Sequence, residues 1–393
     1  MTTPNLFCMN QKVLAILTSR VLYGKERANI TVYKILKEKC NKEIHVVHNS
    51  AAEIKLKSAL AEFYMHSIVA PSRQQRPYRI CRYILEYINS NIKLLILIHR
   101  LNPEVIMMCN EINFYDFYPA LLLSRKKILY RVGDTPAYES LSFRIYNEYV
   151  WKNFVIKKVN RMVSNAKFVQ DSLIATGRVP TNDCIIYNYP PQRNFVNVNE
   201  EAKYKVIDST SIISYGFIGQ VNEPKGVRHL IESTLAILSK GYKISLLIAG
   251  SLDYDKEFSQ EISSIIPEKY KSLIIFLGEI ENLDLFFNYI DVLCIPSIKQ
   301  EPLANVLSEA KYHSCPSIIY PSGGLPELVT HGVDGYICSS PTSNDLYESM
   351  KFYILNKHLI PTQGQAAFSS IPKYGIDRET FEDKWIKAYT TIH

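Results

Sequence analysis

The sequence predicts an α/β protein made of two doubly wound domains, each with a parallel sheet. The chain has 393 residues, two or three times the usual domain length of roughly 150 residues. Hydrophobic residues make up 47% of it and charged residues 21%, which is enough apolar material for packed cores. Short apolar runs alternate with helix-like stretches in both halves, a pattern typical of parallel sheets covered on both faces.

Hydrophobic periodicity predicts the elements of each half. In the first half, strands are expected at 12–17, 43–48, 105–109, 127–130 and 161–164, and helices at 28–39, 77–101 and 143–158. In the second half, strands are expected at 211–218, 244–249, 273–277, 292–296 and 317–320, and helices at 226–240, 301–313 and 344–355. The prolines at 190 and 191 favour a stiff, extended junction between the two domains. Ligands bind beyond the carboxyl ends of parallel strands, so a ligand cleft between two facing domains is expected.

Composition excludes several classes of protein. The apolar run at 92–98 contains Lys93 and is far shorter than the ~20 residues of a membrane span. No basic stretch leads into an apolar segment at 1–10, so we expect a cytoplasmic protein. The eight cysteines form no Cys-x-x-Cys pair, which indicates reduced thiols and no metal site.

The charge is divided unequally along the chain. Residues 1–200 hold 28 Lys and Arg against 15 Asp and Glu, and residues 201–393 hold 17 against 23, so the halves carry +13 and −6. The basic half favours an anionic surface, either nucleic acid or membrane headgroups. A solvated basic face explains the charge equally well.

Two segments after predicted strands carry candidate site residues. Gly219 and Gln220 follow the strand at 211–218, and Lys225 stands at the start of the next helix, where backbone amides and a cation suit a phosphate or diphosphate. A structural turn explains this segment at least as well. Glu301 and Glu309 follow the strand at 292–296, and Pro302 predicts that Glu301 opens the helix.

That helix would place Glu309 about 12 Å beyond Glu301 on a neighbouring face. Two carboxylates at such a separation can hold two parts of one polyhydroxylated ligand, while the amides near Ala304 and Asn305 can hold a diphosphate between them. A helix with one stabilising first-turn acid and one exposed acid is the structural alternative, and spacing alone favours it.

A series of motifs makes the second half more specific. In order along the chain stand Lys225-Gly226, Gly250, Gly278, Pro296-Ser297, Glu301 with Glu309, Gly323-Gly324-Leu325-Pro326-Glu327 and Asp334-Gly335. The ordered set resembles the nucleotide-sugar-binding domain of family 4 retaining glycosyltransferases, the group 1 glycosyltransferases with the GT-B fold. The resemblance implies two facing Rossmann-like domains, an acceptor domain at 1–190 and a donor domain at 204–375, with a helix near 376–393 that crosses back onto the first.

The first half resembles the same family more loosely. Gly24, which opens a helix after the first strand, resembles the family's glycine-rich loop near the sugar diphosphate. Phe381, Trp385 and Tyr389 are spaced for one face of the crossing helix. Three departures stand out: Gln220 replaces the family's usual Arg, Leu303-Ala304 replaces Phe-Gly, and Gly133-Asp134 stands where many relatives have a His. A turn explains Gly133-Asp134 at least as well as a polar role for Asp134.

The resemblance implies a glycosyltransferase that moves a sugar from a nucleoside-diphosphate sugar, UDP-sugar favoured over GDP-sugar, with retention and without a metal or other cofactor. Lys225 and Glu301 are the implied catalytic residues, with Lys225 on the diphosphate and Glu301 on the sugar hydroxyls. The implied donor-binding residues are Gly24, Gly219, Gln220, Leu303, Ala304, Asn305, Val306 and Glu309, the last on the ribose. A nucleotide-sugar epimerase and a lapsed sugar-nucleotide-binding protein are the alternatives, and no nucleic-acid-binding module is visible.

The acceptor is expected to bind the first domain. Basic and aromatic residues interleave there: Arg73, Arg76, Arg79 and Arg82 with Tyr78, Tyr83 and Tyr87, and Trp151 with the lysines up to Lys158. Such residues suit an anionic membrane interface. We therefore expect a glycan or lipid-linked acceptor of surface polysaccharide synthesis and peripheral attachment to the inner face of the cell membrane. A solvated basic helix is the alternative.

Overall fold

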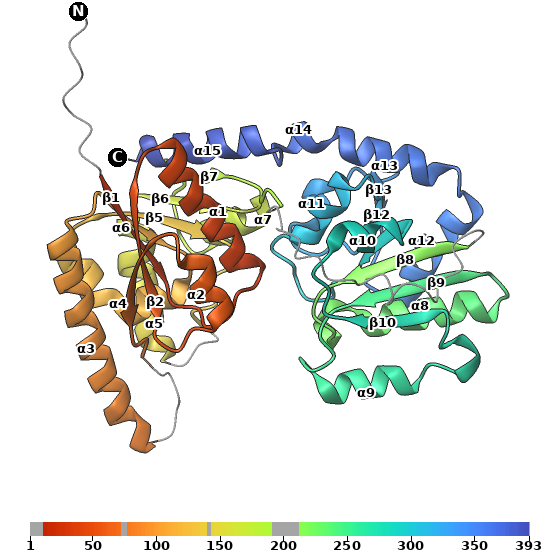
Figure 1. The fold of residues 1–393 in the computed structure, drawn as a ribbon, viewed down its shortest axis with the longest axis horizontal. Coiled ribbons are helices and arrows are strands. Elements are labelled where there is room, and N and C mark those ends of the chain that lie inside the picture. Colours follow the sequence, from red (N-terminus) through yellow and green to blue (C-terminus); the bar gives the residue numbers. More distant parts are fainter. Residues whose placement is uncertain (1–10, 72–76, 140–142, 191–211, 393) are drawn as a thin grey trace, which may run out of the picture. The chain divides into compact units, whose positions relative to one another are not determined.

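The structure is a computed structural model that describes residues 11–71, 77–139, 143–190 and 212–392, with backbone alone at 77–80. The chain divides into two compact units, Met1–Pro191 with Arg378–His393 (unit 1) and Gln192–Asp377 (unit 2). Each unit is a parallel sheet with helices packed on its faces (Figure 1). The predicted α/β fold class is confirmed.

Unit 1 holds a seven-stranded sheet among its described residues, in the order β3-β2-β1-β4-β5-β6-β7. The strands are β1 Lys12–Leu17, β2 Glu43–Asn49, β3 Tyr64–Ile68, β4 Val105–Met108, β5 Lys127–Val132, β6 Arg161–Ser164 and β7 Cys184–Ile185. The helices are α1 Gly24–Lys39, α2 Ile54–Leu60, α3 Pro77–Leu101, α4 Glu111–Ser124, α5 Arg144–Val150, α6 Ile156–Lys158, α7 Lys167–Ala175 and α15 Arg378–Thr390.

Unit 2 holds a six-stranded sheet, counted over residues 212–377, in the order β10-β9-β8-β11-β12-β13. Its strands are β8 Ile213–Ile218, β9 Ile244–Ala249, β10 Ile274–Gly278, β11 Val292–Ile295, β12 Ser317–Ile319 and β13 Gly335–Ile337. Its helices are η3 Glu223–Lys225, α8 Val227–Ser239, α9 Lys256–Ser264, η4 Glu268–Tyr270, α10 Leu283–Asn288, α11 Asn305–Tyr312, η5 Leu325–Leu328, α12 Ser343–Leu355, α13 Leu359–Ser369 and α14 Ile371–Tyr374.

The central strands are apolar because helices cover both faces of each sheet. In β1 every residue from Val13 to Leu17 is at most 1% exposed, and β9 is fully buried from end to end. Strand order reverses between β1 and β4 in unit 1 and between β8 and β11 in unit 2. Ligands of open parallel sheets bind at such reversals, beyond the carboxyl ends of the strands.

Two predicted helices differ from the structure. The helix expected at 301–313 begins only at Asn305, so Glu301 lies in a loop and not on the helix. A proline pushes the residue before it towards extended backbone, and this effect of Pro302 outweighs the preference of proline for a first helical turn. The helix expected at 143–158 contains a π-helical turn, η1 Trp151–Val155, between α5 and α6.

The cysteines are unpaired in the part of the chain that the structure describes. The described cysteines are all free thiols, and Cys8 lies outside the described residues. Burial raises the pKa of Cys338 to about 11, so that the group stays a thiol at neutral pH. No group of three or more His, Cys, Asp or Glu that could hold a metal ion is found among the described residues.

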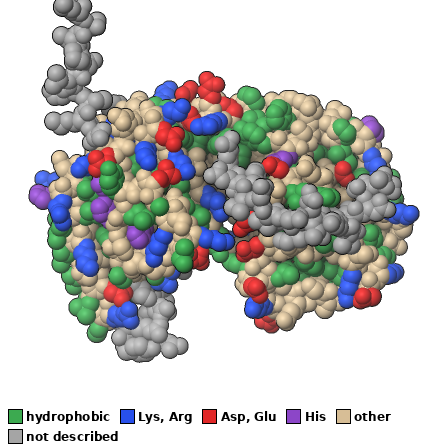
Figure 2. Space-filling model, in the orientation of Figure 1, with side chains coloured by type: hydrophobic (Ala, Val, Ile, Leu, Met, Phe, Trp, Pro, Cys, Tyr) green, Lys and Arg blue, Asp and Glu red, His purple; other side chains and the backbone are tan. Residues whose placement is uncertain are grey.

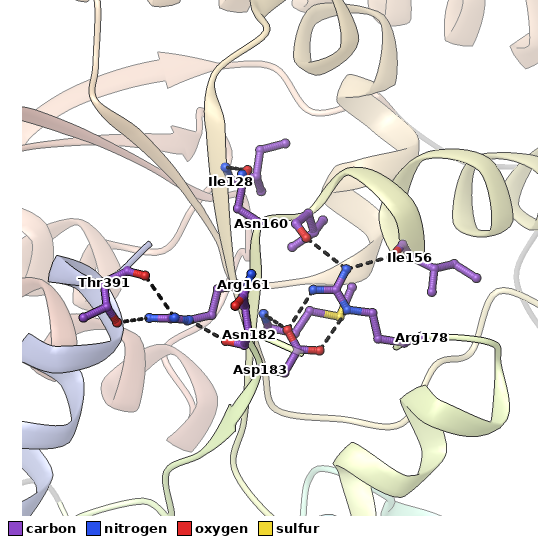
Figure 3. A network of polar contacts seen from close by, with 10 residues as sticks. Ile128, Ile156, Asn160, Arg161, Arg178, Asn182, Asp183 and Thr391 are labelled. Atoms are coloured by element: carbon purple, nitrogen blue, oxygen red, sulfur yellow. Dashed lines mark hydrogen bonds and ion pairs between the residues drawn. The ribbon is translucent and has the colours of Figure 1, made fainter. Parts of the chain in front are cut away.

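The last helix, α15, belongs to the core of unit 1. Phe381, Trp385 and Tyr389 are at most 3% exposed and pack in one cluster with residues of β1, α1 and β4. Arg161 of β6 ties the end of this helix to the sheet (Figure 3). Its guanidinium donates to the carbonyl oxygen of Ala388 at 2.6 Å and to both oxygens of Thr391 at 2.7 and 3.1 Å. A cation at a helix carboxyl end also meets the negative end of the helix dipole.

A second buried arginine lies beside the first (Figure 3). Arg178 binds both carboxylate oxygens of Asp183 at 2.8 and 2.7 Å, and it also donates to the carbonyl oxygens of Ile156 and Val159. Asp183 in turn accepts from the backbone amide of Met162 in β6. The edge of the sheet, α6 and α15 are therefore joined by two guanidinium groups that each donate four hydrogen bonds.

Replacing Arg161 by Met should destabilise unit 1. Carbonyl oxygens at the end of α15 would lose charged donors while buried, which should lower the free energy of unfolding by about 3 kcal/mol. The tryptophans, Trp151 and Trp385, both lie in unit 1, so denaturant unfolding followed by tryptophan fluorescence reports this unit alone.

The control for this substitution is Arg144→Met, which removes an exposed guanidinium 3.9 Å from Glu139. Its effect should stay within about 0.5 kcal/mol. Equal stability of the two variants would contradict the role given to Arg161.

Candidate functional site

The candidate site of unit 2 lies where its strand order reverses. Gly219 and Gln220 follow β8, and Asn222 then starts the short helix η3 by accepting from the backbone amide of Lys225 at 3.1 Å. The loop after β11 runs alongside, because the amides of Ile298 and Lys299 donate to the carbonyl oxygen of Pro224. The two segments are thus joined through their backbones.

The structure brings the two predicted catalytic residues together. The ammonium group of Lys225 contacts carboxylate oxygen Oε2 of Glu301 as a hydrogen-bonded ion pair. The side chains are 28% and 16% exposed, so the pair is half-buried and open on one side. Ser297 donates to the same oxygen of Glu301 at 3.3 Å. The site therefore presents a cation and an anion side by side.

The loop after β12 is the third segment of the site, beside the loops after β8 and β11. The hydroxyl of Ser322 accepts from the backbone amide of Glu301 at 3.2 Å and donates to the carbonyl oxygen of Lys299 at 2.8 Å. The amide of Gly324 donates to the carbonyl oxygen of Glu301 at 2.8 Å. Glu301 is thereby held through its backbone on both sides, which fixes the direction of its carboxylate.

Two glycines permit this close approach of loops. Gly226 has φ +71°, and a Cβ atom there would lie 1.9 Å from the carbonyl oxygen of Pro296. Gly323 has φ +56°, and its Cβ would lie 2.0 Å from the carbonyl oxygen of Glu301. Both positions need left-handed backbone and the absence of a side chain. The close packing of the loops therefore explains why glycine stands at these two positions of the Lys225-Gly226 and Gly323-Gly324 motifs.

The other predicted donor-binding residues of this segment lie around the start of α11. Ala304 is the N-cap, and no side chain caps the helix there. Leu303 is buried, whereas Asn305 and Val306 are partly exposed. A helix start without a side-chain cap leaves backbone amides for an anionic ligand.

Glu309 lies further along α11 and is only 6% exposed. The structural alternative of an exposed acid at this position is therefore wrong. The separation of about 12 Å expected from a shared helix does not apply, because Glu301 precedes the helix. Next to Glu309, the hydroxyl of Ser308 is buried and has no hydrogen-bond partner among the described residues.

Gln220 does not replace the family's arginine as a cation. Its side-chain oxygen accepts weakly from Asn222 at 3.4 Å. The nearest arginine in sequence, Arg228 of α8, is paired with Glu223 at 2.8 Å and Glu261 at 3.0 Å, and these hydrogen bonds raise its pKa. Lys225 is thus the cation that contacts Glu301.

In unit 1, two cations gather near Gly24. Gly24 is the first residue of α1, and Lys25 follows it. A Cβ atom at Gly133, after β5, would lie 3.7 Å from both Lys25 Cε and Arg131 Nη1. Arg131 is buried and donates to the side-chain oxygens of Asn29 at 3.3 Å and Asn188 at 2.7 Å, and burial lowers its pKa. Positive charge therefore surrounds the position where relatives of the family have a histidine.

Asp134 takes no part in that cluster. Its carboxylate accepts from the following backbone amide, that of Thr135, at 3.0 Å, and the residue is exposed. The turn interpretation of Gly133-Asp134 fits this contact.

Unit 1 also contains a cavity of about 290 Å³ at the carboxyl ends of β1, β2 and β4. Its lining is Thr18, Ser19, Arg20, Asn49, Ala70, Pro71, Asn110, Ile112 and Asp116. Most of these side chains are hydrogen-bonding groups, and Asp116 is only 2% exposed. Hydroxyl, amide, guanidinium and carboxylate groups around a concave space suit a polyhydroxylated ligand.

Sequence reasoning missed this cavity and the cluster around Arg131. The signal for the cavity is polar residues after neighbouring strands, Thr18-Ser19 after β1 and Asn110 after β4. β5 extends through Arg131 to Val132, beyond the expected end at 130. The sequence therefore did not indicate that Arg131 is a buried residue of this strand.

Comparison with known proteins shows which proteins the chain resembles. Residues 200–367 match the family described as Glycosyl transferases group 1. The capsular polysaccharide biosynthesis glycosyltransferase CapM of Staphylococcus aureus is 20% identical over 364 residues, which cover 90% of each chain. Among solved structures, Anabaena HepE in complex with UDP and glucose aligns with a TM-score of 0.77 at 18% identity, over 97% of this chain and 100% of that one. A glycosyltransferase from Rickettsia africae aligns with a TM-score of 0.78 at 17% identity, over 98% of both chains.

These similarities and the two parallel sheets define a two-domain α/β protein with the GT-B fold. Residues 200–367 are the part of the chain that resembles group 1 glycosyltransferases, and this region carries the contact between Lys225 and Glu301.

Gly323→Ala should destabilise unit 2, because its Cβ would collide with the backbone of Glu301. We expect a loss of about 2–3 kcal/mol in the free energy of unfolding, measured by calorimetry. The matched control is Gly332→Ala, at φ +75° with nothing within 4 Å of its Cβ. The control has the backbone strain without the collision and should lose about 1 kcal/mol. Identical losses would show that Gly323 is needed for its backbone angle alone.

Proposed function

We propose that this glycosyltransferase moves a hexose from a nucleoside-diphosphate sugar to a glycan or lipid-linked acceptor, with retention at the anomeric carbon. The observation that carries the proposal is the half-buried contact of Lys225 with Glu301 inside the group 1 domain. Lys225 can bind the leaving diphosphate, and Glu301 can bind the sugar hydroxyls. The two side chains lie next to each other, as do the sugar and the phosphate that the breaking bond joins.

In this mechanism Lys225 stabilises the negative charge that grows on the diphosphate as it leaves. A cation fixed by its surroundings stabilises such charge without reorganisation. Glu301 accepts hydrogen bonds from the sugar hydroxyls and orients the ring. Before the donor binds, the two side chains neutralise each other, and the donor's phosphate and hydroxyl groups then take up both charges. Ser297 holds the carboxylate of Glu301 during this exchange, and Ser322 holds its backbone amide.

The remaining donor contacts are proposed at α11. The backbone amides near Ala304, Asn305 and Val306 receive phosphate oxygens, and the buried carboxylate of Glu309 receives the ribose hydroxyls. A UDP-sugar is the favoured donor over a GDP-sugar, and the complex of HepE with UDP and glucose supports this choice.

The reaction is proposed to proceed on one face of the sugar, as in family 4 glycosyltransferases, with the leaving phosphate assisting removal of the acceptor proton. No divalent metal is required in this scheme, since Lys225 and backbone amides supply the positive charge.

The acceptor is proposed to bind the cavity of unit 1, where Asn49, Asn110 and Asp116 offer hydrogen-bonding groups to sugar hydroxyls. The similarity to CapM supports a role in cell-surface polysaccharide synthesis. We propose that the enzyme works in the cytoplasm, attached peripherally to the inner face of the cell membrane.

The test is turnover of a panel of UDP- and GDP-sugars, with and without EDTA, followed by release of the nucleoside diphosphate. The proton NMR coupling of the product's anomeric position reports retention or inversion. We expect release from one UDP-sugar, unaffected by EDTA, with retention. Formation of an epimer from the nucleotide sugar alone, or binding of every donor without release, would overturn the proposal.

Lys225→Ala should impair turnover more than donor binding, because the charge on the diphosphate grows as the bond breaks. We expect kcat to fall by about 100-fold or more while the dissociation constant of the donor rises less than tenfold. Lys269→Ala, which removes a lysine of the short helix η4, is the control for loss of one positive charge. Equal losses in kcat and affinity would argue for ground-state binding alone.

Glu309→Ala should weaken donor binding, because a ribose hydroxyl pair would lose a charged acceptor. The expected cost is about 1.5–3 kcal/mol, a 10- to 150-fold rise in the dissociation constant measured by calorimetry. The residue is buried, so Glu309→Gln is measured beside it to keep the volume of the side chain. Unchanged affinity in both folded variants would remove Glu309 from the donor site.

A further inference from the structure

One face of α3 exposes a continuous row of large aliphatic side chains. Ile84, Leu85, Ile88, Ile92 and Ile96 are 48 to 68% exposed. Residues four apart on a helix lie above one another, so four of these side chains form a stripe about 18 Å long. α3 runs along one side of unit 1, and green hydrophobic side chains lie along that edge in the space-filling view (Figures 1 and 2).

The packing of α3 fixes this stripe towards the outside. Ser90, Asn91, Leu94 and Ile98 form the buried face of the helix. Asn91 donates to the carbonyl oxygen of Asp116 at 2.8 Å and accepts from the amide of Ala120 at 3.1 Å, where Pro119 interrupts the hydrogen bonds of α4. Rotation of α3 to hide the stripe would break both hydrogen bonds and leave buried polar groups without partners.

The charges beside the stripe are mostly positive. Lys93, His99 and Arg100 are exposed on α3 itself, and Arg82 pairs with the single acid of the helix, Glu86. α4, which packs on α3, ends with exposed Leu122 and Leu123 followed by the exposed Arg125. An apolar stripe bordered by cations matches an anionic lipid surface, with aliphatic groups among the acyl chains and cations at the headgroups.

We propose that α3 docks unit 1 onto an anionic bilayer, lying in the plane of the membrane with its aliphatic stripe inserted. This deepens the membrane attachment included in the proposed function, and it does not depend on glycosyl transfer. No helix in the described part of the chain is long and apolar enough to cross a membrane. The stripe is therefore assigned to a surface-lying helix.

Two of the aromatic residues that the sequence suggested for membrane contact, Trp151 and Tyr87, do not belong to this docking surface. Trp151 is fully buried and stacks on Tyr138, so it does not face a membrane. Tyr87 is partly buried and hydrogen-bonded to Tyr146 at 2.7 Å. Arg73 and Arg76 lie outside the described residues, and the side chains of Tyr78 and Arg79 are not described.

A second copy of the chain is a poorer occupant. Pairing of two α3 stripes would bring Lys93, Arg100 and Arg82 of one helix near the same cations of the other. With Glu86 as the only acid on the helix, such a dimer would be bordered by like charges. A lipid surface supplies the missing negative charge.

The test is flotation of the full chain, without donor, with vesicles of phosphatidylglycerol and phosphatidylcholine and with vesicles of phosphatidylcholine alone. We expect binding to the anionic vesicles at low salt. The double variant Ile88→Glu/Ile92→Glu should lower the partition coefficient by about tenfold or more, because it places carboxylates among acyl chains. Lys93→Gln/Arg100→Gln should reduce binding to anionic vesicles and leave binding to neutral ones unchanged.

The matched control is Leu355→Glu/Phe368→Glu, which adds the same charge at exposed apolar residues of α12 and α13 in unit 2. It should bind vesicles like the unchanged protein. Tryptophan fluorescence verifies that unit 1 of the α3 variant is folded, and UDP-sugar binding verifies the donor site independently. Equal vesicle binding by the two double variants, or no binding by the unchanged protein, overturns the proposal. A dimer in sedimentation velocity that only the α3 variant dissociates assigns the stripe to a second copy instead.

Discussion

The reversal of strand order beside the first strand of each sheet determines where chemistry is possible in this protein. In a parallel sheet all carboxyl ends meet at one edge, and crossover helices fill both faces. Only where the order reverses do two neighbouring loops leave in opposite directions and make room for a ligand. The cavity of unit 1 lies at the reversal between β1 and β4, and the contact of Lys225 with Glu301 lies at the reversal between β8 and β11.

The contact of Lys225 with Glu301 serves stability and chemistry at once. Removing one partner of a buried ion pair is costly because the other charge is left without compensation. This pair is half-buried, so solvent and ligand can reach it while the backbone contacts of Ser322 and Gly324 hold Glu301 in place. A site that neutralises itself when empty avoids the repulsion or desolvation that an isolated cation would suffer. A bound donor therefore replaces the interaction between Lys225 and Glu301, and neither charge is left without a partner before the donor binds.

The predictable part of the structure is the part governed by local pattern. β1, β6 and β9 have the expected bounds, and β1 shows why, because this strand is buried on both faces and is a continuous apolar run from Val13 to Leu17. The strands missed at 64–68, 184–185 and 335–337 are exposed or only two to three residues long, so they carry no such run. Glu301 and Lys225 are 76 residues apart in sequence, and their contact arises only when β8 and β11 pair. The family motifs indicated both residues, but not that they touch.

The position of Glu309 also depends on groups far away in the sequence. Lys311, two residues further along α11, is 2% exposed and binds Asp334 and Ser370, each at 2.9 Å. Burial lowers the pKa of Lys311, and the carboxylate of Asp334 acts against that shift. Asp334 also accepts from the amide of Thr330, so each partner has a second hydrogen bond beside the ion pair. The loop holding Glu301 positions the start of α11, and this buried pair fastens its last turn to the turn before β13. Because α11 is fixed at both places, Glu309 has one position relative to Glu301, as residues that grip two ends of one ligand require.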